Sequence, residues 1–158
     1  MKNSLFKSQL CSVARSLEIV GEWWTLLIVR EAFFGVRRFN EFQKKLGIAR
    51  NVLSERLTKL VEAGIMERHP ASGRGNPLDY ELTEMGHDLF PTVVALMQWG
   101  DRWISGPGGE PVTLIERESG EAIGRVQALG VHGKPLGLGD IRIAPGPGAN
   151  GAIQKRFE

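Results

Sequence analysis

The side chains best suited to recognition chemistry gather in one short run, residues 49–64, which reads A-R-N-V-L-S-E-R-L-T-K-L-V-E-A-G. Arg presents paired donors that match guanine N7 and O6, and Asn offers a donor and an acceptor that match adenine. Ser, Thr and Lys suit phosphate oxygens or adaptable base contacts, and Glu can accept from cytosine N4 or pair with a Lys four residues later. The pattern predicts a DNA-reading surface made of Arg50, Asn51, Ser54, Glu55, Thr58 and Lys59.

The apolar residues of the same run indicate the helix that must position these side chains. Leu53, Leu57 and Leu60 recur at the spacing of one helical face, with Val61 beside them. We therefore expect a recognition helix over residues 50–63, with a buried leucine face and a polar outer face.

A second short helix pattern precedes it. Residues 41–46 fit a helix with Asn40 as its N-cap and Gly47 closing it, and the following turn should send Ile48 into the core. Two further candidates for DNA contact stand immediately before this helix, Arg37 and Arg38.

Two strand patterns follow the recognition helix, at residues 65–69 and 78–82. The loop between them, residues 70–77, holds Arg74 between two glycines. A cation at such a tip can enter a minor groove, and the alternative is a solvated loop. Helix, turn, helix and ribbon is the layout of a winged helix-turn-helix, an α+β fold that is mainly α.

The distribution of charge supports DNA as the partner. The whole chain carries a net charge of +2, but residues 37–74 hold nine Lys and Arg against four Glu, a net +5. A polyanion would meet the chain at this segment. The alternative is a winged-helix protein–protein interaction module that does not bind DNA, because a fold does not fix a function.

Amphipathic or apolar helices are expected on both sides of this segment, over residues 5–20, 22–34 and 84–104. In the last of these, Pro91 marks either a kink or the first turn of a fresh helix. The apolar stripe of residues 84–104 is wider than one small domain needs, which favours a homodimer on a pseudo-palindromic operator.

The composition changes after residue 104, where twelve of the 20 glycines and five of the eight prolines lie. Short strands are expected at residues 112–118, 123–127 and 140–144, and the chain after residue 145 should be loose. We therefore divide the chain into a winged-helix and dimerisation domain, residues 1–104, and a small β-rich extension, residues 105–158.

Several motifs resemble those of the HxlR-type regulators. The run C-S-V-A-R-S-L-E-I-V-G-E-W-W-T-L-L-I-V-R from Cys11 is similar to the family's C-P-V-x-x-x-L-x-x-I-G-x-x-W-T-x-L-I-L-R. G-V-R-R-F-N-E-F from Gly35, V-L-S-E-R-L-T-K-L-V-E-A-G from Val52 and Y-E-L-T-E-M-G from Tyr80 match further family motifs in register. The resemblance covers about residues 11–103 and implies a dimeric bacterial transcription factor, a repressor by expectation, related to the MarR group.

The chain departs from the family at three places. Ser12 follows Cys11 where the family has Pro, and Ala49-Arg50 replaces the usual Ser-Pro opening of the recognition helix. Some longer members carry cysteines that suggest a zinc knuckle in the extension. The corresponding positions here are Ser119, Leu129 and His132, so the resemblance implies a metal-free remnant.

Two modes of effector sensing follow from the resemblance and from the aromatic residues. Several family members sense electrophiles or oxidants at the cysteine that matches Cys11, which in this chain lacks a second cysteine to pair with. The rival is an aromatic ligand held between subunits by Trp23, Trp24 and Trp99.

Other classes of function find no support in the sequence. His69, His87 and His132 are dispersed and show no metal-ligand spacing, and no catalytic constellation is present, so we expect no enzyme, metal or cofactor. No apolar run reaches the roughly 18 residues of a membrane helix, and the first residues do not resemble a signal peptide. One cysteine fits a reducing compartment, so we expect the bacterial cytoplasm.

Overall fold

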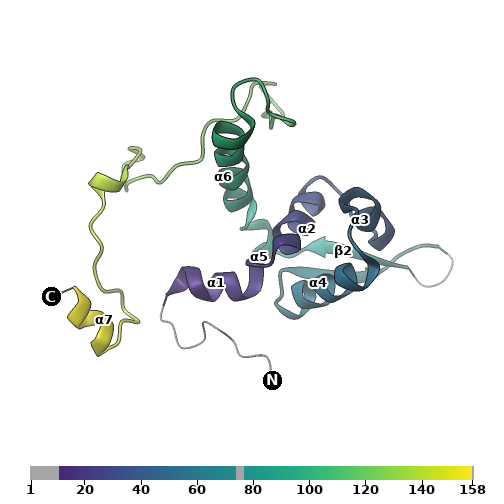
Figure 1. The fold of residues 1–158 in the computed structure, drawn as a ribbon, viewed down its shortest axis with the longest axis horizontal. Coiled ribbons are helices and arrows are strands. Elements are labelled where there is room, and N and C mark those ends of the chain that lie inside the picture. Colours follow the sequence, from purple (N-terminus) through teal and green to yellow (C-terminus); the bar gives the residue numbers. More distant parts are fainter. Residues whose placement is uncertain (1–10, 74–76, 158) are drawn as a thin grey trace. The chain divides into compact units, whose positions relative to one another are not determined.

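The structure, a computed structural model, describes residues 11–73 and 77–157, and its ribbon is shown in Figure 1. The chain divides into two compact units, residues 1–94 and 95–158, which are described separately. The described elements of the first unit, in chain order, are α1 (Ser12–Val20), α2 (Trp23–Phe33), α3 (Phe39–Leu46), α4 (Arg50–Glu62), β1 (Met66–Pro70), β2 (Leu78–Leu82), α5 (Glu84–His87) and the start of α6 (Phe90–Gly100).

The first two helices confirm the expected pattern in the part of the chain that is described. α1 ends at Val20, where the N–H of Gly21 donates to the carbonyl of Leu17 at 2.8 Å. The predicted residues 5–10 of this helix lie outside the described residues. α2 is the central helix: Ile28 and Val29 are fully buried. Gly35 follows it with a φ of +87°, a backbone conformation that favours glycine.

The helix-turn-helix consists of α3 and α4, joined by a three-residue turn. Gly47 takes the left-handed conformation at the end of α3, and its N–H donates to the carbonyl of Gln43 at 3.0 Å. Ile48 is 3% exposed, which confirms that the turn sends this side chain into the core. The recognition helix begins at Arg50 as predicted, and it ends at Glu62.

The predicted N-cap of α3 was wrong. The helix begins at Phe39, so the N-cap is Arg38 and Asn40 lies inside the first turn. The backbone N–H of Arg38 donates to the carboxylate of Glu41 at 3.3 Å, which satisfies one of the free donors at the helix start. Arg38 is extended because it also forms a bridge with Asp79 of β2, a tertiary contact that local sequence does not reveal.

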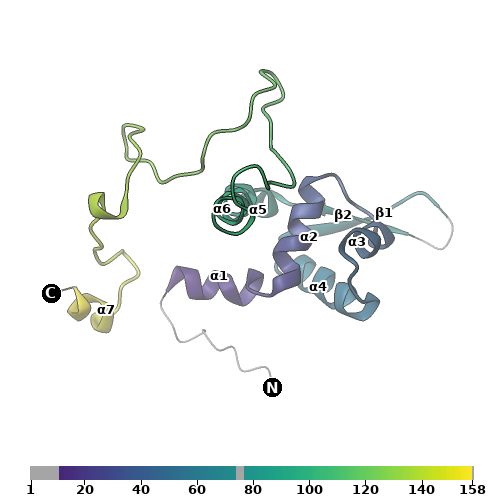
Figure 2. The same ribbon diagram turned by 45° about the horizontal axis from the view of Figure 1, so that its top comes forward.

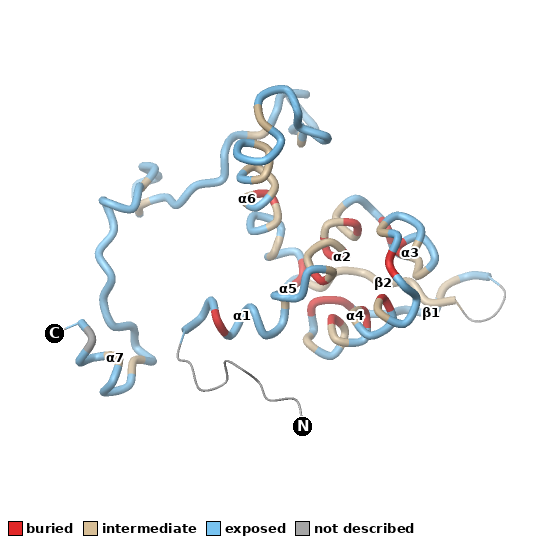
Figure 3. Tube along the Cα trace, in the orientation of Figure 1, coloured by how far each residue is buried: buried red, intermediate tan, exposed pale blue. Residues whose placement is uncertain are grey.

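One hydrophobic core holds the first unit together. Figure 3 shows the buried residues gathered on the facing sides of α2, α3 and α4 and at the start of β1. The leucine face of α4 is confirmed, since Leu53, Leu57 and Leu60 are each at most 1% exposed. The other buried members of the cluster are Ile28, Val29, Val36, Phe42, Ile48, Ile65 and Met66. This burial fixes the orientation of the recognition helix.

β1 and β2 form the antiparallel hairpin of the wing, which Figure 2 shows beside α3 and α4. Met66 pairs with Leu82, and Pro70 pairs with Leu78, so β1 starts one residue later than predicted and β2 has its predicted bounds. The segment before α3 adds to this hairpin, because the N–H of Tyr80 donates to the carbonyl of Arg37 at 2.9 Å.

A polar corner joins the wing to α5. Thr83 caps α5 as predicted, since its hydroxyl accepts from the N–H of Gly86 at 3.2 Å. The same hydroxyl donates to the carbonyl of Gly64 at 2.5 Å, and this contact ties the end of α4 to the end of β2. Gly86 is buried here, and a Cβ at this position would lie 2.3 Å from the carbonyl oxygen of Ile65, so the close packing requires glycine.

The expected helix over residues 84–104 is divided. α5 ends at His87, α6 starts at Phe90, and a π-helical turn, η1 (Asp101–Ser105), continues it. Pro91 therefore lies in the first turn of a fresh helix, the second of the two predicted alternatives. The ring of Phe90 meets the ring of Phe33 edge-on at 5.2 Å, which attaches this start of α6 to α2.

The strands predicted for the C-terminal extension do not form in the described residues. In their place are two isolated bridges, Ile115 with Ala122 and Leu129 with Pro135, a 3₁₀ turn η2 (Leu138–Asp140) and a short helix α7 (Gly151–Arg156). None of the described residues after Val94 is buried. A strand pattern needs an apolar partner surface to become a sheet, and within its own unit this segment has none.

Gln98 fastens the extension to α6 within the second unit. Its side-chain amide donates to the carbonyl of Gly124 at 3.0 Å and accepts from the N–H of Val126 at 2.8 Å. Ser119, one of the three knuckle positions, instead donates to Glu116 at 2.5 Å, and Leu129 and His132 are exposed. The metal-free remnant stays a prediction.

No helix in the described part of the chain is long and apolar enough to cross a membrane.

The contact at Gly86 gives a first prediction. Gly86→Ala should lower the free energy of unfolding by about 1–3 kcal/mol, because the new methyl group meets a backbone carbonyl that cannot move freely. Gly100→Ala is the matched control, since nothing lies within 4 Å of a Cβ built there. Urea denaturation followed by circular dichroism measures both, and equal stability of the two variants would contradict the close contact.

Candidate nucleic-acid interface

The outward face of α4 carries the predicted DNA-reading residues. Arg50, Asn51, Ser54, Glu55 and Thr58 are exposed, and Lys59 is partly exposed. They share this face because Leu53, Leu57 and Leu60 point into the core and the intervening positions must point away from it. The structure thus brings all six predicted residues of the helix onto one accessible surface.

Arg50, the first residue of α4, is placed by an aromatic ring. Its guanidinium carbon lies 5.3 Å from the centroid of the Phe39 ring, which belongs to α3. This cation–π contact joins the two helices at the opening of the recognition helix. Ala49, the N-cap, makes no side-chain hydrogen bond, so the start of α4 lacks a capping side-chain oxygen.

The alternative of an ion pair for Glu55 is confirmed. Its carboxylate lies 2.9 Å from Nζ of Lys59, four residues later on the same helix. Both side chains are partly exposed, at 52% and 36%, so the pair is weak and can separate when a phosphate or a base competes for either group.

Arg56 of α4 adds to the net charge of the segment but not to its exposed surface. It contributes to the net +5 of residues 37–74, yet its side chain is only 12% exposed. Nη2 pairs with a carboxylate oxygen of Glu22 at 3.1 Å, and Nη1 lies 4.0 Å from Glu55. Arg56 therefore attaches the recognition helix to the start of α2 and lies away from the exposed polar face.

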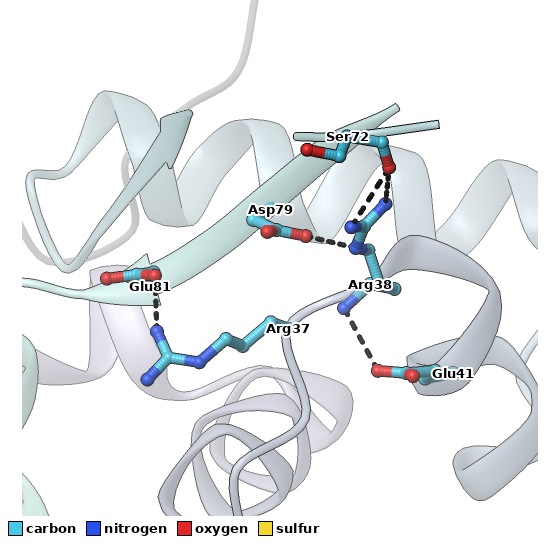
Figure 4. A network of polar contacts seen from close by, with 6 residues as sticks. All are labelled: Arg37, Arg38, Glu41, Ser72, Asp79 and Glu81. Carbon is cyan, nitrogen blue, oxygen red and sulfur yellow. Dashed lines mark hydrogen bonds and ion pairs between the residues drawn. The ribbon is translucent and has the colours of Figure 1, made fainter. Parts of the chain in front are cut away.

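Arg37 and Arg38 also lie in ion pairs, which Figure 4 shows at the base of the wing. Arg37 pairs with Glu81, and Nε of Arg38 pairs with Asp79. Both acids belong to β2. The prediction that these two arginines contact DNA stays a prediction, but the structure gives each of them an acidic partner that the sequence analysis missed.

Within residues 37–73, three cations outside the predicted set have no ion pair among the described residues, namely Lys44 and Lys45 of α3 and Arg68 of β1. All three are exposed. Arg50 also has no acidic partner among the described residues. Arg74, the predicted cation of the wing tip, lies outside the described residues. Charge alone would have selected Lys44, Lys45 and Arg68 from the sequence. Their lack of an ion pair could not be predicted, because Glu41 and Glu67 lie within reach along the chain.

The residues predicted to sense an effector fall into different environments. Cys11 is exposed and precedes the first residue of α1. Trp23 is 89% exposed, whereas Trp24 packs against the core. Trp99 is 55% exposed on α6, in the second unit. Among the described residues, no group of three or more His, Cys, Asp or Glu side chains could hold a metal ion.

Comparisons with known proteins point the same way as this geometry. Residues 19–107 match the HxlR-like helix-turn-helix family. An uncharacterised HTH-type transcriptional regulator of Mycobacterium tuberculosis, Rv3095, is 47% identical over 137 residues, which cover 87% of each chain. That match is longer than residues 19–107, so it includes part of the extension.

Solved structures share the fold. The crystal structure of the transcription-factor candidate PA1607 has a TM-score of 0.81 and 45% sequence identity, and it covers 87% of this chain and 96% of its own. A regulator assigned to the MarR family from Enterococcus faecalis has a TM-score of 0.52 and 27% identity, covering 63% of this chain and 91% of its own. The structural neighbours therefore include MarR-like proteins, as the sequence predicted.

The inward ion pair of Arg56 gives a second prediction. Arg56→Ala should lower the free energy of unfolding by about 1–3 kcal/mol, mainly because it removes a packed aliphatic stem, and also because it removes an ion pair in which the guanidinium is largely buried although Glu22 is exposed. Lys59→Ala, on the same helix, should cost less than about 1 kcal/mol, since its pair with Glu55 is partly exposed. Guanidinium unfolding curves distinguish the two, and equal losses would show that Arg56 is a surface residue in solution.

Proposed function

This chain belongs to the HxlR-like helix-turn-helix family, and from that premise we propose that it binds a pseudo-palindromic operator as a homodimer and represses transcription. The chain is a DNA-binding transcriptional regulator and not an enzyme. Repression is the proposed outcome because a protein seated on an operator excludes other proteins from that stretch of DNA.

DNA recognition is supported mainly by the polar outward face of α4, which lies beside exposed cations of α3 that have no acidic partner among the described residues. We propose that α4 enters the major groove, with Arg50 and Asn51 at base edges and Ser54, Thr58 and Lys59 at phosphates or adaptable base contacts. Lys44 and Lys45 would hold phosphates from α3, and the wing, residues 70–77, would lie near the minor groove. The ring of Phe39 supports the assignment of Arg50, because it limits where that guanidinium can lie.

The apolar residues left exposed on α1 and α6 support the homodimer. On α1, Val13 and Leu17 are 67% and 47% exposed and lie one helical turn apart. On α6, Leu96 and Trp99 are 54% and 55% exposed and share a face. Monomers rarely leave several large apolar side chains of one helix face in water. We propose that residues 1–104 form the DNA-binding and dimerisation domain.

The alternative is a winged-helix module that binds proteins and not DNA, and the uncompensated cations of α3 and α4 count against it.

Sensing of an electrophile by Cys11, or of an aromatic ligand by Trp23, Trp24 and Trp99, stays a prediction. The exposure of Cys11 permits reaction with a reagent in solution. We place the protein in the bacterial cytoplasm, where an operator would be accessible.

If α4 reads bases and α3 holds phosphates, replacing Arg50 should change the sequence preference, whereas replacing Lys45 should change the affinity for all sequences. Arg50→Ala should relax the preference for one base pair, by about 1–3 kcal/mol, because a bidentate contact to a base edge is lost. Lys45→Ala should weaken binding to all sequences and reduce the slope of log affinity against log salt by about 0.9, the value for one phosphate contact. Both effects can be measured by fluorescence titration at several salt concentrations. One duplex is selected by binding to the protein from a pool of random DNA sequences, and the other is a scrambled version of it. A wild-type affinity that does not change with salt would favour the protein-interaction module.

If α1 lies in the proposed dimer interface, replacing one of its exposed apolar residues should halve the mass of the particle in solution. Leu17→Glu should convert a dimer to a monomer, because a charge would be buried in an apolar interface. Arg15→Glu is the control, since Arg15 lies on the other side of the helix from Val13 and Leu17. Sedimentation velocity measures the mass. A monomeric wild type would contradict the dimer, and a dimeric Leu17→Glu variant would exclude α1 from its interface.

A further inference from the structure

We propose that Arg38 is a positioning residue, which holds the wing in place against the helix-turn-helix, and that it is not a phosphate contact. The inference rests on the proposed function, because the wing is assigned there to DNA. It assigns to Arg38 a role different from the one its charge predicts. Arg38 contacts Glu41, Asp79 and Ser72, and Figure 4 shows these three contacts together.

The main chain of Arg38 connects α3 to β2. Its N–H donates to the carboxylate of Glu41 in the first turn of α3 at 3.3 Å. Its backbone also forms a bridge with Asp79, beside the hydrogen bond from the N–H of Tyr80 to the carbonyl of Arg37. The residue that caps the first helix of the helix-turn-helix is therefore also bridged to β2 of the wing.

The side chain of Arg38 extends the same connection toward the wing loop. Nε pairs with Oδ1 of Asp79, and both Nη1 and Nη2 lie 3.4 Å from the carbonyl oxygen of Ser72. One guanidinium thus contacts both arms of the hairpin, beyond the end of β1 and within β2. A planar fork with several fixed donors can do this, whereas a lysine ammonium is a point charge on a flexible stem.

The environment of Asp79 supports positioning as the purpose of this pair. Its Oδ1 is shielded from solvent and makes no hydrogen bond among the described residues, so Arg38 is the cation that compensates it. The side chains of Arg38 and Asp79 are 37% and 25% exposed, less than the 52% and 42% of Arg37 and Glu81 in the neighbouring pair. Binding of Arg38 to a phosphate would leave a shielded carboxylate without its cation.

The two roles predict opposite effects of removing Asp79. If Arg38 were a phosphate contact restrained by Asp79, then Asp79→Asn would free the guanidinium and tighten DNA binding. If Arg38 is a positioning residue, then Asp79→Asn loosens the wing and weakens binding to the selected operator, by about fivefold for a loss near 1 kcal/mol. Because Asp79→Asn also adds one unit of positive charge, the sign of the change relative to a charge-matched variant decides between the roles.

The first measurement uses the full chain without DNA. Amide hydrogen exchange should be about fivefold faster at Ala71 and Tyr80 in Asp79→Asn and in Arg38→Lys than in the wild type. These amides report on the wing, because they donate to the carbonyls of Pro77 and Arg37. Arg38→Lys keeps the charge and loses the fork, so a phosphate role would leave this exchange unchanged.

The second measurement is the affinity for the selected operator duplex over a range of salt concentrations. Glu67→Gln is the matched control for charge, because it removes one acid from β1 of the same wing, where Glu67 pairs with His69 at 3.3 Å. Asp79→Asn should bind more weakly than Glu67→Gln, although both gain one unit of positive charge. Arg38→Lys should bind more weakly than the wild type with the salt slope unchanged.

Two results would overturn the proposal. One is an Asp79→Asn variant that binds DNA at least as tightly as Glu67→Gln. The other is unchanged exchange at Ala71 and Tyr80 in both wing variants, with thermal unfolding confirming that all variants are folded. Failure of the proposed function looks different: the wild type would show no DNA binding at all, and the exchange experiment would still report on the wing.

Discussion

Burial of the leucine face of α4 is the constraint on which the rest of the first unit depends. Leu53, Leu57 and Leu60 are almost fully buried against apolar side chains that include Ile28 and Phe42. A helix with one face fixed in this way has no rotational freedom left, so its remaining side chains must point outward in a fixed order. The polar surface of the recognition helix is thus a consequence of core packing.

The same core divides the basic residues into two groups with different roles. Arg37, Arg38 and Arg56 lie where acidic side chains of β2 or of the start of α2 are within reach, and each forms an ion pair there. Lys44 and Arg50 lie on helix surfaces without an acidic partner among the described residues. A net charge summed along the sequence cannot separate the groups, because pairing depends on which segments the fold brings together.

The accuracy of sequence-based prediction follows how local each feature is. The bounds of β2, the start of α4 and the cap at Thr83 depend on residues near one another in the chain, and all three are confirmed. The N-cap of α3 was wrong because Arg38 is held by Asp79, 41 residues later in the chain. The strands predicted after residue 104 failed for a related reason, since an alternating pattern forms a sheet only where another apolar surface can cover it.

The sequence by itself determined the family, the order of the helix-turn-helix and wing, and the face of α4 that is available to DNA. These features are set by periodicity and by turn residues such as Gly47, whose effects act over a few positions. Only the tertiary structure decided which cations remain free and which are held by acids, because ion pairs join residues that are distant in the chain. The ion pairs of Arg38 with Asp79, at the base of the wing, and of Arg56 with Glu22, at the start of α2, are of this kind.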